Sequence, residues 1–109
     1  MKVVFIQDGD SIDYTPTVDV PAGTVVVQND LVGVTKRHIP ANTLGSLAVS
    51  GVFDFPKATA TGSAVGAGFN MFWNPTTQVA TTIGTFKLIG KTIKAATDAD
   101  TTVRIRLNQ

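Results

Sequence analysis

The sequence has no cysteine and no glutamate, and it contains one histidine, one tryptophan and one tyrosine among 109 residues. Without cysteine there is no disulfide, no thiolate ligand for a metal and no thiol nucleophile. All eight acidic residues are Asp, so a strong helix former is missing. Charge is also sparse. Only 16% of the residues are charged and the formal net charge is +1, which argues against strong nonspecific binding to nucleic acid.

Residues with β-branched side chains are abundant instead, with 14 Val, 7 Ile and 16 Thr. These side chains are restricted at χ1 and suit a pleated surface. The composition therefore disfavours a helical bundle or a coiled coil, and an apolar content of 43% excludes a disordered chain. No repeat or internal boundary is evident. The length suits one domain, so we expect residues 1–109 to form a single β-rich domain.

The opening segment Met1–Ile6 is apolar, but the run ends at Gln7–Asp10, which makes it too short for the core of a signal peptide. No apolar stretch approaches the roughly 20 residues that span a membrane. We therefore expect no membrane association. Residues Lys2–Ile6 have the composition of a first strand, and residues 1–15 are predicted to form an extended N-terminal arm or strand.

Alternating patterns bounded by turn residues predict about seven to nine short strands. The run of three Val in Thr24–Gln28 is typical of a strand buried on both faces. Residues 57–69, rich in Ala, Thr, Ser and Gly, have no clear period and are predicted to form a long loop or one short helix. We predict an all-β fold, a small antiparallel barrel or sandwich. The segments with strand character are Lys2–Ile6, Ile12–Thr15, Thr24–Gln28, Leu31–Thr35, Leu47–Phe55, Met71–Trp73, Gln78–Thr82, Phe86–Lys94 and Val103–Leu107.

Two details of the last strands can be predicted from their alternation. The phase of the pattern shifts at Ile89-Gly90, where a glycine often marks a β-bulge. In Val103–Leu107 the apolar residues alternate with Arg104 and Arg106. The two Arg side chains are therefore predicted to lie on one face of the sheet, opposite the core.

One segment ends like a phosphate-binding loop, with Gly90-Lys91-Thr92 following Gly84. Such a loop has four residues between its two glycines, whereas five separate Gly84 from Gly90 here. The segment also alternates like a strand, and no helix is predicted after it to supply a positive N-terminus. We therefore interpret it as a strand with a bulge.

Other candidate sites fail on residue type. The acidic run Asp8, Asp10, Asp13 and Asp19 does not match an EF-hand, although an irregular calcium loop stays open as an alternative to solvated carboxylates. Lys36–Pro40 is predicted to form an exposed loop. It contains His38, the only histidine, which cannot build a zinc site by itself. We expect no catalytic residues, no metal and no cofactor, and hence no enzymatic activity.

Charge is divided unevenly along the chain. Residues 1–54 carry six Asp against three basic residues, and residues 55–109 carry six basic residues against two Asp. The basic stripe of the second half could contact phosphates, but single-strand binders usually add a platform of exposed aromatics. Most aromatics here have apolar neighbours and are predicted to be core, so a protein-facing or solvated surface is favoured over a nucleic-acid surface. The stripe comprises Lys87, Lys91, Lys94, Arg104 and Arg106.

Five segments, in order along the chain, resemble a family of small phage and prophage proteins associated with capsid decoration, in which some members are labelled recombinase-like. Gly51–Ala58, with the sequence Gly-Val-Phe-Asp-Phe-Pro-Lys-Ala, is the most specific of them. The recombinase label finds no support in these residues, because the phosphate loop fails and the chain is short. The five segments are Phe5–Tyr14, Asp30–Val34, Gly51–Ala58, Gly68–Asn74, and Ile89–Lys91 followed by Val103–Leu107.

The resemblance implies a structural virion protein, made in the host cytoplasm, that binds the major capsid protein on the exterior of an assembled head and stabilises it. It also implies a homo-oligomer, with a trimer favoured. Another structural protein of the tail or baseplate, or a small nucleic-acid-binding barrel, stays open as an alternative. The residues expected to contact the capsid or a neighbouring subunit are Lys2, Val3, Val4, Phe5, Ile6, Lys36, Arg37, His38, Lys87, Lys91, Arg104 and Arg106.

Overall fold

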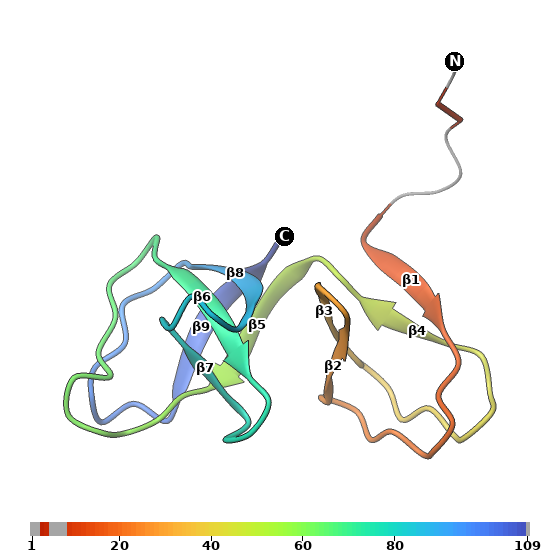
Figure 1. The fold of residues 1–109 in the computed structure, drawn as a ribbon, viewed down its shortest axis with the longest axis horizontal. Coiled ribbons are helices and arrows are strands. Elements are labelled where there is room, and N and C mark those ends of the chain that lie inside the picture. The colour runs from red at the N-terminus through yellow and green to blue at the C-terminus, as the bar shows by residue number, and fades with distance from the viewer. Residues whose placement is uncertain (1–2, 5–8, 109) are drawn as a thin grey trace.

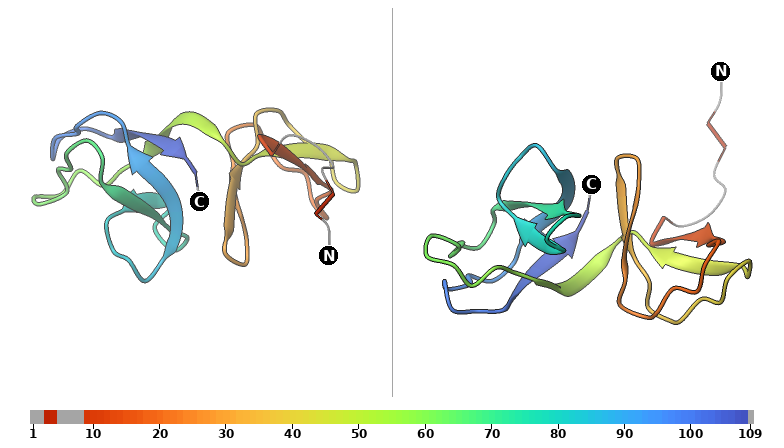
Figure 2. Two further views of the ribbon diagram at one scale, coloured as in Figure 1. Left: turned by 90° about the horizontal axis from the view of Figure 1, so that it is seen from above. Right: turned by 60° about the horizontal axis from the view of Figure 1, so that its bottom comes forward.

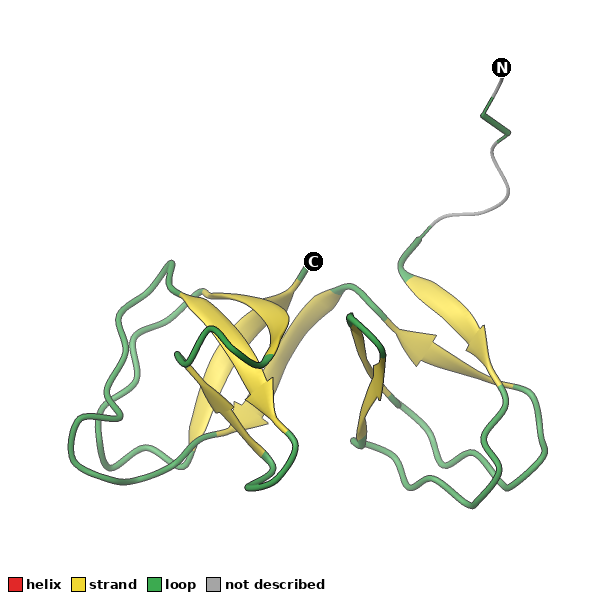
Figure 3. Ribbon diagram, viewed as in Figure 1, coloured by secondary structure: helices red, strands yellow, loops and turns green. Residues whose placement is uncertain are grey.

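The computed structural model describes residues 3–4 and 9–108, which form nine β-strands and no helix (Figures 1 and 3). The predicted all-β class is confirmed. Within these residues there is accordingly no helix able to cross a membrane. The strands are β1 (Ser11–Tyr14), β2 (Val25–Gln28), β3 (Leu31–Val34), β4 (Gly45–Ala48), β5 (Gly51–Pro56), β6 (Asn70–Asn74), β7 (Val79–Thr81), β8 (Lys87–Thr92) and β9 (Thr102–Leu107).

The strands form two antiparallel sheets that lie side by side and are joined by the passage from β4 to β5 (Figures 1 and 2). The first sheet has the order β1-β4-β3-β2, and the second has the order β5-β9-β8-β6-β7. Neither sheet closes into a barrel, so that part of the prediction is wrong. The second sheet approaches closure only where an isolated bridge joins Lys57, directly after β5, to Ala80 in β7.

The first sheet consists of two ladders, β1–β4 and β2–β3, that share a single register pair, Val34 with Ala48. A buried threonine reinforces the β2–β3 ladder. The Thr35 hydroxyl donates to the Pro21 carbonyl at 2.8 Å and accepts from the Thr24 amide at 2.9 Å. Because the Thr35 side chain is fully buried, these bonds fix the loop before β2 to the end of β3.

The second sheet is built around β9, the last strand in the sequence, which lies between β5 and β8. Val103, Ile105 and Leu107 are buried on its inner face, as their alternation predicts. The predicted bulge is confirmed. Met71 pairs with Gly90 but Phe72 pairs with Leu88, which leaves one extra residue in β8. The extra residue bends β8 over the core.

The two sheets share one hydrophobic cluster. Val32 and Val34 of β3 belong to the same buried cluster as Ile89, Ile105 and Leu107 of the second sheet. The aromatic part of this cluster includes Phe55 and Trp73, whose rings meet edge to face with centroids 6.3 Å apart. The β2–β3 hairpin is therefore the element through which the first sheet packs against the second.

Two local predictions need correction, and a third is resolved between its alternatives. Thr24–Gln28 is predicted to be buried on both faces, but β2 is an edge strand on which Val27 is 38% exposed. Leu47–Phe55 is predicted to be one strand, but it is interrupted between β4 and β5, where Gly51 takes a positive φ of 122°. Residues 57–69 form a loop containing turns, which confirms the loop rather than the short helix among the two predicted alternatives.

The predicted first strand falls largely outside the described residues, which do not include Lys2, Phe5 or Ile6. The structure describes Val3 and Val4, which belong to neither sheet.

The close approach of β8 to β9 generates a test of the fold. A Cβ at Gly90 would overlap the backbone carbonyl of Arg106, so replacement by Ala must separate the two strands or shift the bulge. We expect Gly90→Ala to lower the free energy of unfolding by about 3 kcal/mol, at the upper end of overpacking costs. The measurement is urea denaturation followed by Trp73 fluorescence.

Gly84→Ala is the matched control. A Cβ there would meet only the ring of Phe72, at 3.9 Å, so its unfolding midpoint should stay within the scatter of surface substitutions. Equal stability of the two variants would contradict the strand geometry.

Candidate functional site

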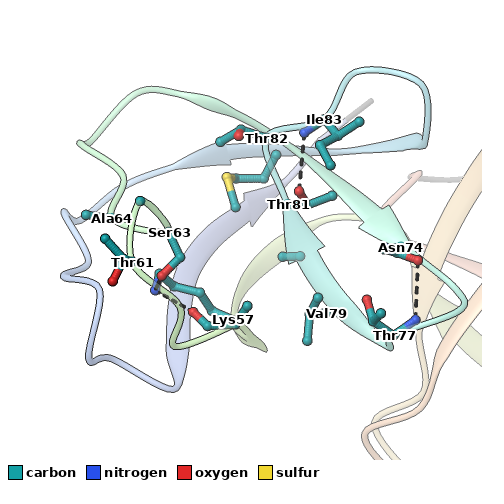
Figure 4. A pocket seen from close by; sticks show the side chains of 14 residues that line it. Lys57, Thr61, Ser63, Ala64, Asn74, Thr77, Val79, Thr81, Thr82 and Ile83 are labelled. Atoms are coloured by element: carbon teal, nitrogen blue, oxygen red, sulfur yellow. Dashed lines mark hydrogen bonds between the residues drawn. The ribbon is translucent and has the colours of Figure 1, made fainter.

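A buried lysine lies directly after β5. Lys57 is 6% exposed, and its ammonium group donates to the Ala58 carbonyl at 2.7 Å and to the Ser63 hydroxyl at 2.9 Å. A longer bond, 3.4 Å, reaches the carbonyl of Asp100. Lys57 thus connects the loop 57–69 to the turn before β9. It lines a hollow of about 410 Å³, whose opposite wall is formed by β6 and β7 (Figure 4).

A lysine beside a serine invites comparison with a nucleophile and its general base. Catalysis of that kind needs a neutral lysine that accepts the proton of the serine hydroxyl. Here Lys57 donates to Ser63, and the hydroxyl of Ser63 donates to the carbonyl of Ala60 at 2.5 Å. Because the other two partners of the Lys57 amine are carbonyl oxygens, which only accept, this arrangement is suited to fixing a loop rather than to activating a nucleophile.

The predicted basic stripe divides into paired and unpaired residues. Lys87 forms a 2.5 Å ion pair with Asp30 in the β2–β3 turn, which links the two sheets at the surface. The hydrogen bond from Lys87, together with its charge, lowers the pKa of Asp30. Lys87 is therefore engaged within the chain and is a weaker candidate for an external contact than its place in the sequence implied.

Arg104 is engaged in the same way, on the outer face of the second sheet. Its guanidinium contacts both carboxylate oxygens of Asp54, at 3.0 and 3.2 Å, across the β5–β9 ladder. This bond lowers the pKa of Asp54 and raises that of Arg104. The charge of Lys94 lowers the pKa of Asp54 slightly further. The two opposite charges of the pair cancel each other on this part of the face. Because both side chains are about half exposed, the pair adds little to folding stability.

Lys91 and Arg106 are a different case. They are register partners on β8 and β9, both exposed, and neither forms an ion pair among the described residues. They line a hollow of about 270 Å³ together with Ile93. Val52, opposite Arg106 on β5, and Ile93 are about half exposed. This set, Val52, Lys91, Ile93 and Arg106, is called the β8–β9 patch below.

The second group of unpaired cations lies in the first sheet. Lys36, Arg37 and His38 are exposed, as predicted, and line a hollow of about 660 Å³ between their loop and strands β1 and β4. Asp13 of β1 lines the same hollow, but forms no ion pair with them. Ile39, predicted to belong to the exposed loop, is instead 4% exposed and bridges to Val20. Residues 36–38 are called the basic loop below.

The N-terminal candidates are only partly described. Lys2, Phe5 and Ile6 lie outside the described residues. Val3 and Val4 are 101% and 71% exposed. The described residues contain no group of three or more acidic, His or Cys side chains able to hold a metal ion. The structure therefore places the predicted residues in separate regions and brings together only Lys91 with Arg106, and the three members of the basic loop.

Comparison with protein families decides which family the chain belongs to. A model of the phage cement protein family matches residues 6–107. The chain belongs to the phage cement protein family. Comparisons with curated proteins and with solved structures each found no match. Family membership confirms the resemblance seen in the sequence and makes this chain a capsid-binding structural protein of phages.

Sequence reasoning did not predict that Lys57 of this cement protein is buried and connects two loops. The one available hint was its position, directly after Pro56 in the most specific segment of the family resemblance. Nothing in the local pattern shows that it is buried. Two of its three partners are backbone carbonyls of two loops, and backbone groups carry no sequence signal.

Removal of the Lys57 ammonium should weaken the cement protein fold. Lys57→Met keeps the apolar stem but leaves the carbonyls of Ala58 and Asp100 without a charged donor. Hydrogen bonds to charged groups contribute roughly 1.5–3 kcal/mol, partly offset here by no longer burying a charge. We expect a net loss of about 1–2 kcal/mol of unfolding free energy in urea denaturation. The exposed substitution Lys91→Met is the control, and equal losses in both variants would contradict the role of Lys57.

The Asp54–Arg104 pair should make a small contribution to folding stability that is lost in acid. Because the folded pKa of Asp54 is lowered, its stabilisation is fully present above the unfolded pKa and is lost as pH falls through the folded pKa. We expect the melting temperatures of wild type and Asp54→Asn to converge as pH is lowered from about 6 to about 2. Asp10→Asn, which removes an exposed carboxylate outside any ion pair of the described residues, is the control. A gap between wild type and Asp54→Asn that stays constant with pH would contradict the assignment.

Proposed function

We propose that this cement protein binds the exterior of an assembled phage head and stabilises it, as a homo-oligomer, with a trimer favoured. The family match supports capsid binding. The proposal further takes residues 1–109 as one domain, supported by the packing of Val32 and Val34 into the core of the second sheet. It includes no enzymatic activity. Synthesis in the host cytoplasm followed by binding to the finished head completes the proposed location.

The observation that carries the proposal is the position of the unpaired cations. Lys91 and Arg106 on one sheet, and the basic loop on the other, are exposed and have no acidic partner among the described residues. Acids elsewhere on the chain neutralise Lys87 and Arg104. Unpaired cations beside half-exposed Val52 and Ile93 suit a partner surface that is acidic and partly apolar. We assign that surface to the major capsid protein.

Weak contacts are sufficient for this role. A head presents the same surface many times, and an oligomer contacts several copies at once. Linked contacts therefore raise the overall avidity well above that of one contact. A protein that acts in this way needs fixed surfaces rather than an active site. The nucleic-acid alternative is weaker, because Phe69, which is 56% exposed and bonded through its backbone to Thr92, is a single aromatic beside the β8–β9 patch, whereas single-strand binders usually stack successive bases on several.

The proposal is tested with purified heads that lack the protein. Wild-type protein should add density to the outer surface of the heads in electron micrographs. Binding should weaken as salt rises, because exposed charges are screened. Lys91→Ala with Arg106→Ala, and Lys36→Ala with Arg37→Ala, should each raise the apparent Kd by about tenfold, equivalent to about 1.4 kcal/mol.

Thr76→Asp with Thr77→Asp is the matched control, because it lowers the net charge by the same amount at an exposed turn. It should bind like wild type. No added density with wild-type protein would overturn the capsid assignment. Equal binding by all three double variants would overturn the assigned surfaces. Tight, salt-dependent retention on immobilised single-stranded DNA would favour the nucleic-acid alternative instead.

A further inference from the structure

Strand β2 is an edge of the first sheet, and some of its backbone amides and carbonyls point away from β3. The Thr35 amide donates to the Thr24 carbonyl at 3.0 Å, which makes that pair a hydrogen-bonded one. In an antiparallel ladder the two kinds of pair alternate. Val26 therefore bonds across to β3, whereas the amides and carbonyls of Val25 and Val27 point away from the sheet. β2 thus offers two donors and two acceptors to an added strand.

The other three sheet edges carry features that prevent such addition. β1 has the exposed Asp13 at its centre. β5 begins at Gly51, with a positive φ of 122°, and ends at Pro56, which has no amide hydrogen. β7 has three residues, and its Ala80 already bridges to Lys57. Charge, irregular backbone, proline and shortness are the usual protections of an edge strand.

β2 has none of these protections. No residue from Val20 to Asn29 is charged, and β2 itself contains neither Pro nor Gly. The β2–β3 hairpin lies on the side of the first sheet that faces the second, and its turn is tied to β8 by the Asp30–Lys87 ion pair (Figure 2). Val27 is 38% exposed and the following Gln28 is exposed as well. An uncharged, regular and accessible edge of this kind is a template for strand addition.

The same chain carries an apolar segment suited to that edge. Val3 and Val4 are 101% and 71% exposed, and they lie in Lys2–Ile6, whose composition predicts a strand. The segment precedes β1, which is the opposite edge of the same sheet from β2. A copy therefore offers a strand at one edge and an acceptor at the other. Contacts of this head-to-tail kind form a ring when the rotation between successive copies closes.

We propose that the free edge of β2 binds the N-terminal segment around Val3 and Val4 of a second copy as an added strand. This inference rests on the homo-oligomer of the proposed function and names the surfaces that form it. Each copy donates one segment and accepts one, so three copies can satisfy all three edges. Burial of Val3 and Val4 at the junction would supply the apolar area of the contact.

Val27→Pro tests the edge directly. Its amide points away from β3, so proline removes a donor from the added strand without removing a bond of the β2–β3 ladder. We expect Val27→Pro to raise the concentration for half-assembly at least tenfold in sedimentation measurements, with an unchanged far-ultraviolet circular dichroism spectrum. Val27→Thr keeps the amide and the branched side chain, and should assemble like wild type.

The double variant Val3→Asp with Val4→Asp tests the segment that is added as a strand. This test remains valid even where the proline variant fails to fold, because neither residue belongs to a sheet of the monomer. It should also be monomeric. Amide exchange gives a readout at single residues. Val25 and Val27 should be protected in the wild-type oligomer and exchange rapidly in this variant. Val26, which bonds to β3, should be protected in both.

Several results would overturn the inference. These are a folded Val27→Pro variant that assembles like wild type, rapid exchange of Val25 and Val27 within the oligomer, and protection that does not depend on protein concentration. Protection that appears only when heads are added would assign the edge to the capsid protein instead. A wild-type protein that is monomeric at every concentration yet decorates heads would refute this inference and the proposed homo-oligomer, and would leave the capsid function standing. An oligomer with the expected protection that leaves heads undecorated would refute only the capsid function.

Discussion

The contact between the β2–β3 hairpin and strand β8 couples the two halves of the molecule. Val32 and Val34 are the fully packed residues through which the first sheet enters the core of the second. The first sheet buries only a few apolar residues outside this cluster, among them Ile39 and Leu47, and its two ladders meet at a single register pair. Burial of these two valines and the bonds of Thr35 therefore set the position of every surface on the first sheet, the basic loop and the β2 edge included.

Charge on this protein is organised by position more than by quantity. Asp30 and Asp54 each occupy one basic side chain, while the register of β8 with β9 places Lys91 and Arg106 next to each other without an acid. A net charge of +1 conceals this arrangement. On the outer face of the second sheet, the charges of Asp54 and Arg104 consequently cancel on the β5 side, whereas the β8–β9 patch is positive. The charge of this face is therefore unevenly distributed, which the net charge does not show.

Much of the fold could be predicted because strand alternation is a local signal. The pattern in Val103–Leu107 gave the buried face of β9, and the phase shift at Ile89-Gly90 located the bulge. A run of valines, by contrast, has no alternation, so the sequence could not show that β2 is an edge. The candidate site was predictable by residue type only. Whether Lys87 or Lys91 is free depends on which strand lies beside it, and that is decided by pairing between distant segments.

The place of β9 in the second sheet has a consequence for a chain under synthesis. β9 is the last strand in the sequence, yet it lies between β5 and β8, so neither neighbour completes its pairing until residues 102–107 have left the ribosome. The core that receives Val32 and Val34 closes only at that point, and Arg106 joins Lys91 only then. A chain in which β9 has not yet paired with β5 and β8 thus lacks the β8–β9 patch.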